Sequence, residues 1–66
     1  MPILKTYTFY LRDGGEQPAG FEPLLCRTND EIVAKALDLL ARNPHCHAVD
    51  VYFGDTELLS LKQPER

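Results

Sequence analysis

Apolar and polar residues alternate most clearly over residues 3–12, where β-branched and aromatic side chains dominate. This pattern predicts a strand with Tyr7, Phe9 and Leu11 on its core side. Asp13-Gly14-Gly15 ends the strand and opens a polar loop over residues 13–20, which we expect to be flexible. A weaker apolar run over residues 21–27 predicts a second strand at a sheet edge, because Pro23 cannot donate a ladder hydrogen bond.

A helical period follows these strands and predicts a helix over residues 29–42. Thr28 and Glu31 match a capping box, in which the Thr28 hydroxyl accepts from the amide of Glu31. Asn43 followed by Pro44 ends the helix, with Asn43 expected in a left-handed cap. The apolar positions at helical spacing are Ile32, Val33, Ala36, Leu37, Leu40 and Ala41.

The C-terminal third alternates again and predicts a hairpin between strands 47–53 and 57–62. Its register has two solutions. A two-residue Gly54-Asp55 turn places Leu58 beside Val51, whereas a three-residue turn with a bulge places Leu59 and Leu61 beside Val51 and Val49. We favour the bulged register because it gathers more apolar side chains on the helix side.

These elements predict an α+β fold of the form β-β-α-β-β. One amphipathic helix covers only one face of a small sheet. A right-handed crossover from the second to the third strand leaves room for the first strand between them. We therefore expect a four-stranded antiparallel sheet of order 2-1-3-4 with one helix packed on one face. Residues 1–66 form a single domain, with a flexible tail over residues 63–66.

Length and charge narrow the function classes. The chain has 66 residues, with 7 basic and 10 acidic side chains and a net charge of −3. A domain of this size has a thin core and no room for a large enclosed active site. The acidic balance and scattered basic residues argue against a nucleic-acid partner. We expect no membrane span and no export signal, and hence a cytoplasmic protein with reduced cysteines.

A family resemblance rests on three segments. The first segment is Tyr7-Thr8-Phe9-Tyr10-Leu11-Arg12-Asp13-Gly14-Gly15, the second is the capped helix over 28–42, and the third is the hairpin that begins at Val49. In these segments, which span about nine-tenths of the chain, the protein resembles small uncharacterised alphaproteobacterial proteins grouped as domains of unknown function, of the DUF6894 type. The resemblance implies a small α+β bacterial domain with no established activity, and it carries over no catalytic residues.

Cys26, His45, Cys46 and His47 are the residues that most invite a chemical interpretation, because two thiolates and two imidazoles could bind zinc. Their spacing lacks the paired ligands of a zinc site. The helix also separates Cys26 from Cys46 by about 20 Å along the sheet. His45 and His47 point to opposite faces from Cys46, so neither is placed to activate its thiol. We interpret them as a strand cysteine and a polar turn, and we expect no catalytic residue, cofactor or metal.

The sheet face opposite the helix is the stronger candidate. It favours a non-enzymatic protein–protein interaction module that uses this open face or an edge strand, with a homodimer as one form of that contact. The alternative is a small-molecule or metal-binding domain that uses loop 13–20 and His45–His47, and nucleic-acid binding is disfavoured. The residues expected at the interaction surface are Thr6, Thr8, Tyr10, Leu24, Asp50 and Tyr52, beside Glu22, Cys26, Ala48, Leu58 and Ser60.

Overall fold

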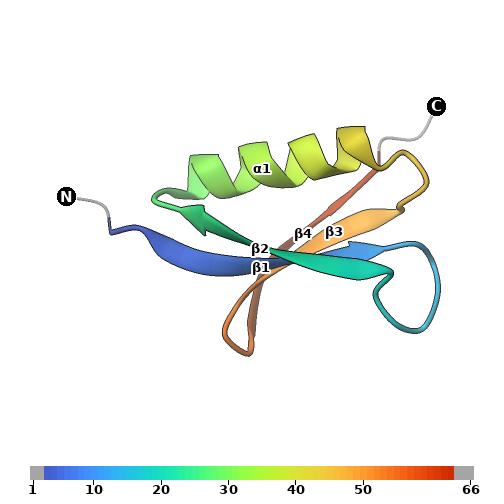
Figure 1. Cartoon of the computed structure of the whole chain (residues 1–66), viewed down its shortest axis with the longest axis horizontal. Helices are drawn as coiled ribbons and strands as arrows, with labels where there is room; N and C mark the ends of the chain where they lie inside the picture. The colour runs from blue at the N-terminus through green and yellow to red at the C-terminus, as the bar shows by residue number, and fades with distance from the viewer. Residues whose placement is uncertain (1–2, 64–66) are drawn as a thin grey trace.

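The computed structural model describes residues 3–63. Its elements, in chain order, are β1 (Lys5–Arg12), β2 (Gly20–Cys26), α1 (Asn29–Arg42), β3 (Ala48–Phe53) and β4 (Thr56–Lys62). The four strands form one antiparallel sheet of order β2-β1-β3-β4, and α1 lies along one face of it (Figure 1). The predicted fold class and strand order are confirmed.

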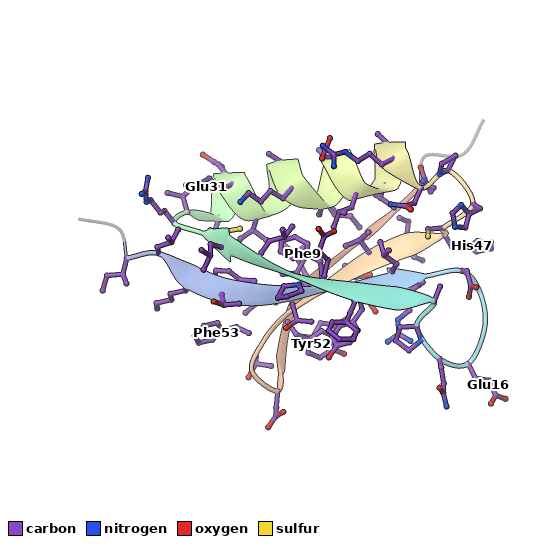
Figure 2. All side chains as sticks on the ribbon, viewed as in Figure 1. Phe9, Glu16, Glu31, His47, Tyr52 and Phe53 are labelled. Atoms are coloured by element: carbon purple, nitrogen blue, oxygen red, sulfur yellow. The ribbon has the colours of Figure 1, made fainter. Side chains whose placement is uncertain are left out.

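Strand β1 lies between β2 and β3 and orients the core. Phe9 is fully buried between the sheet and α1, while Tyr52 lies on the opposite side of the sheet (Figure 2). Phe9 pairs with Val51 and Leu11 with Val49, so these apolar side chains share the helix side. The buried cluster consists of Phe9, Cys26, Ile32, Ala36, Leu39, Leu40, Val49 and Val51.

Helix α1 has the predicted bounds, but its C-terminal cap differs from the prediction. At the N-terminus the Thr28 hydroxyl accepts from the amide of Glu31 at 3.2 Å, as expected. At the C-terminus Asn43 has φ −124°, which is not left-handed. Its amide donates to the carbonyls of Leu39 and Leu40, and its Nδ2 donates to Leu39 at 2.8 Å. An asparagine side chain thus satisfies the last carbonyls without a left-handed backbone.

The β3–β4 hairpin confirms the predicted pairing by a different route. Val51 pairs with Leu59 and Val49 with Leu61, as favoured. The expected three-residue turn is wrong, because Phe53 pairs with Thr56 and only Gly54 and Asp55 lie between them. The extra residue enters one step later, as a bulge in β4 opposite Val51 and Tyr52. A tight turn and a bulge together place the leucines on the helix side.

Strand β2 overturns part of the predicted open face. Leu24 pairs with Tyr7, Glu22 with Phe9 and Cys26 with Lys5, so all three lie on the helix face. Leu24 packs against the core and Cys26 is completely buried. The placement of Leu24, Glu22 and Cys26 on the open face is therefore wrong. Because β2 carries apolar residues at both odd and even positions, alternation alone did not reveal which set faces the helix.

The loop that follows β1 is one residue shorter than the predicted range 13–20. The loop after β1 spans residues 13–19, since Gly20 already belongs to β2, and Gly15 donates to Asp13 Oδ1 at 3.1 Å. Gly14 has φ +96°, and a Cβ there would lie 3.1 Å from His47 Nε2, so both the backbone conformation and the tight contact disfavour a side chain at this position. The flexibility predicted for loop 13–20 stays a prediction.

Gln63, the first residue of the tail that the sequence predicts to be flexible, is held by hydrogen bonds. Gln63 lies in a bonded position, with its amide donating to the His47 carbonyl at 2.7 Å. Its Nε2 donates to the carbonyl of Leu40 at 2.6 Å and to that of Asn43 at 3.2 Å. Gln63 therefore joins the end of β4 to the end of α1. The rest of the predicted tail, residues 64–66, lies outside the described residues.

Replacing this tether should weaken the fold measurably. We expect Gln63→Ala to lower the free energy of unfolding by about 1–2 kcal/mol, because two carbonyls at the helix end lose their donor. Gln17→Ala, in the exposed loop, is the matched control and should change it by less than about 0.5 kcal/mol. Urea unfolding followed by circular dichroism measures both. Equal stabilities for the two variants would contradict a structural role for Gln63.

Candidate functional site

The residues on the open face of the sheet form rows that run across the strands, and we call each row of paired residues a rank. Tyr10 pairs with Phe21 on one side and with Asp50 on the other, and Asp50 pairs with Ser60. The next rank contains Pro23, Thr8, Tyr52 and Glu57. Of the six residues expected at this surface, Thr6, Thr8, Tyr10, Asp50 and Tyr52 lie on the open face, and Leu24 does not.

Aromatic rings occupy the centre of this face. Tyr10 and Tyr52 meet edge to face, with centroids 5.2 Å apart and planes at 87°. Tyr10 also contacts Phe21 of β2, with centroids 6.0 Å apart. Both tyrosines are only partly buried. Edge-to-face pairs hold each other in place, so these rings form a fixed platform with exposed surface.

Asp50 anchors the polar part of the open face. Its residue is 8% exposed, and its two carboxylate oxygens accept from Arg12 Nε at 2.8 Å and from Ser60 Oγ at 2.6 Å. The hydrogen bond from Arg12 to Asp50 raises the pKa of the guanidinium. A nearly buried carboxylate needs such partners. The network therefore ties β1, β3 and β4 together and fixes the position of Arg12.

The β2 side of the open face is apolar and exposed. Phe21 is 66% exposed and Leu25 is 50% exposed, and Pro23 lies between them. The register places all three opposite open-face residues of β1. We call Phe21, Pro23 and Leu25 the β2 stripe. Contiguous exposed apolar side chains of this kind are typical of an interaction site.

The free edge of β2 is poorly suited to pairing with another strand. Lys35 Nζ donates to the Leu25 carbonyl at 2.5 Å, so this carbonyl points away from β1. In an antiparallel ladder the residues two apart point the same way, which directs Pro23 outward as well. Pro23 has no amide hydrogen to offer. The side chains of the stripe, rather than its backbone, are what this region presents.

A shallow depression runs along the open face between opposite charges. It has a volume of about 300 Å³ and is lined by Tyr10, Arg12, Pro18, Tyr52, Gly54 and Asp55. Arg12 stands at one end and Asp55, in the hairpin turn, at the other. Pro18 shows that the loop after β1 borders this surface.

Sequence reasoning missed four residues of this surface, namely Arg12, Phe21, Pro23 and Leu25. Assigning Leu24, Glu22 and Cys26 to the open face concealed the three β2 residues that lie there. Arg12 alternates with the core residues of its strand, but the sequence analysis does not link it to Asp50. A signal was present in the sequence, because an Arg and an Asp on facing strands of one sheet side are expected to pair.

The residues considered for metal or thiol chemistry are kept apart. Cys26 lies opposite Lys5 at one end of β1, while His47 donates to the Arg12 carbonyl at the other end, next to Cys46. Seven residues of strand separate these points, or about 23 Å. Both cysteines are free, in agreement with their predicted positions at opposite ends of the sheet, and both are buried. No group of three metal-binding side chains occurs within residues 3–63.

The alternative site has one geometric element in its favour. The loop after β1 and the His45–His47 segment do meet, through the close approach of His47 to Gly14. Asp13, an acidic residue of this loop, is already engaged, because its Oδ1 accepts a hydrogen bond from the Gly15 amide. The absence of metal and cofactor stays a prediction.

Comparisons with known proteins do not assign the chain to a family. No family model matches it, and no curated protein and no solved structure is significantly similar to it. The resemblance to the DUF6894 type thus stays a prediction. Over residues 3–63 the structure contains no helix of the length and apolar character that crossing a membrane requires.

Burial governs the chemistry of Cys26 and makes a testable difference to stability. Loss of hydration raises the pKa of its thiol in the folded state. The unfolded thiol ionises near pH 8.5, whereas the folded protein keeps its thiol protonated to higher pH. Above pH 8.5 the loss of the proton therefore stabilises the unfolded state relative to the folded state. We expect the stability from this group to be complete below about pH 8 and to fall as the pH rises above it.

Thermal unfolding between pH 7 and pH 10 measures this fall for the wild type and for Cys26→Ala. The variant should start less stable but lose less with rising pH. Ile32→Val, which removes a buried methylene but no titratable group, is the control and should keep the wild-type slope. Identical slopes for wild type and Cys26→Ala would contradict the assignment.

Proposed function

We propose that this protein is a non-enzymatic interaction module whose open sheet face binds a protein surface. The observation that carries the proposal is the β2 stripe beside a fixed aromatic platform, on the face that α1 leaves uncovered. The partner surface must offer apolar groups to Phe21 and Leu25 and polar groups to the charges around Arg12 and Asp55.

The energetics favour covering this face. Complete burial of a large apolar side chain contributes about 1.5–3 kcal/mol relative to leaving it exposed. Phe21 and Leu25 still expose half or more of their surface. A domain of this length draws only about 3–5 kcal/mol from a single core. Covering two such residues would therefore add a contribution comparable with the stability of the domain itself.

The order of the platform also favours recognition. Tyr10 and Tyr52 are held by each other, and Arg12 is held by Asp50. Side chains already fixed lose little conformational entropy when a partner binds. Tyrosine and arginine are the residue types that most often carry binding energy in protein interfaces.

The features of an enzyme site give less support. The candidate nucleophiles Cys26 and Cys46 are buried, and burial raises the pKa of Cys26, which disfavours the reactive thiolate. The open-face depression is shallow, and Arg12, one of its two charged lining residues, is already engaged by Asp50. These observations favour a surface for contact with another molecule over an enclosed catalytic site.

Photo-crosslinking in cells of the native host tests the proposal. A photoreactive phenylalanine analogue replaces Phe21 on the open face, or Leu37 on the exposed face of α1 as the matched control. Leu37 is 53% exposed, so the two positions are similarly accessible. We expect the analogue in place of Phe21 to crosslink to a protein and give adducts of discrete mass. The analogue in place of Leu37 should give none.

A second substitution shows whether an adduct depends on the surface. Leu25→Lys leaves the crosslinking position intact but places a charge in the stripe, so the adduct yield should fall at least about tenfold. Circular dichroism checks that the variant is folded. Absence of adducts at Phe21, or equal adducts at Phe21 and Leu37, would refute the proposed function.

A further inference from the structure

The charges of the open face are divided between its two ends. Arg12 and Lys62 both pair with Ala48 and form the rank at one end. Glu57 pairs with Tyr52 nearer the other end, and Asp55 follows in the turn that closes the hairpin. Asp50 already pairs with Arg12, so the face carries Lys62 at one end and Glu57 and Asp55 at the other, with the tyrosines between them. Such an arrangement is complementary to its own reverse.

We infer that the partner of the open face is a second copy of this chain. The inference rests on the proposed function and specifies the occupant of its surface. The two-fold axis lies in the interface, runs across the strands, and passes between the rank of Tyr10 and the rank of Tyr52. This operation reverses the strand direction, so Lys62 lies over Asp55 of the partner subunit and the converse holds at the other end.

The same operation places apolar surface over apolar surface. An axis across the strands leaves each strand above its own counterpart, so the β2 stripe of one copy covers the stripe of the other. Phe21 then lies over Pro23 of the partner subunit. An axis parallel to the strands would instead reverse the strand order, so the β2 stripe of one copy would lie over polar β4 of the other and the basic end of one copy would lie over the basic end of the other. Among the two simple face-to-face arrangements, the charges select the first.

Two copies packed in this way form a familiar architecture. Face-to-face sheets align their strands within about 30° of each other, which antiparallel strands in the two copies allow. The interface is isologous, as in most homodimers, because each copy contributes the same patch. Helices α1 then lie on the two outer faces of a four-layered particle.

The edges of the sheet are less suitable for self-association. The β2 edge lacks an amide at Pro23, and its Leu25 carbonyl is already bound by Lys35. The β4 edge contains the bulge next to Leu59 and carries Lys62. Bulges, prolines and lysines at strand edges discourage pairing between sheets. The open face therefore remains as the surface that fits a second copy.

Sedimentation equilibrium of the purified full chain, from micromolar to millimolar concentration, tests this arrangement through two charge reversals. In Lys62→Glu an introduced acid faces Asp55 of the partner subunit, and in Asp55→Lys an introduced base faces Lys62 of the partner subunit. Each variant alone should self-associate at least about tenfold more weakly than wild type, because every dimer contains two like-charge contacts.

Mixing the two variants supplies the decisive observation. In a mixed dimer both contacts join opposite charges, so the mixture should associate as tightly as wild type within about threefold. Arg27→Glu is the control, because it changes the charge by the same amount as Lys62→Glu but lies in the turn before α1. It should associate as wild type does.

The outcomes separate the two proposals. A wild-type dimer whose charge variants fail alone and recover on mixing supports the two-fold arrangement. A dimer insensitive to both variants, or no recovery in the mixture, overturns it. A strictly monomeric wild type overturns the second copy as occupant. In that case adducts from Phe21 in cells would still support a different protein partner, whereas their absence would refute both proposals.

Discussion

One helix can bury only one face of this sheet, and the rest of the structure depends on that constraint. The apolar side chains of α1, β1 and β3 pack into a single layer between helix and sheet, centred on Phe9 and Val51. The opposite face receives what the core does not need, and alternation along each strand puts it there. Its character is set by the residues that alternate with the core, which explains why it combines tyrosines, a partly buried ion pair and an exposed apolar stripe.

The open face is ordered even though no segment within residues 3–63 covers it. Asp50 supplies most of this order, because its two carboxylate oxygens bind side chains from β1 and β4. Such a network costs desolvation, which its hydrogen bonds offset only when every group is satisfied. Among the described residues, no buried side-chain nitrogen or oxygen lacks a partner. A satisfied network on an exposed face yields a surface of fixed shape and fixed charge, which suits recognition more than it suits catalysis.

The sequence predicted the architecture well because its strongest signals are local. The helix bounds follow from Thr28 and Asn43, and the strand order follows from the edge position of Pro23 and the handedness of the crossover. The leucine register of the hairpin also followed from patterning, although a bulge rather than a longer turn produces it. The face of β2 could not be predicted, because Phe21 and Leu25 compete with Leu24 and Cys26 as apolar sets. That single ambiguity moved Leu24 onto the candidate surface and removed the stripe from it, since a shift of one residue exchanges the faces of a strand.

The central claim is that the open face, and not the helix face, meets a second copy of the chain. Filtered nuclear Overhauser spectra of a sample that mixes isotope-labelled and unlabelled chains report contacts between copies directly. The account predicts signals between copies from the ring of Phe21 and the methyl groups of Leu25, and none from Leu37 on the outer surface of α1. Signals from Leu37 without any from Phe21, or no signals between copies at millimolar concentration, would contradict it.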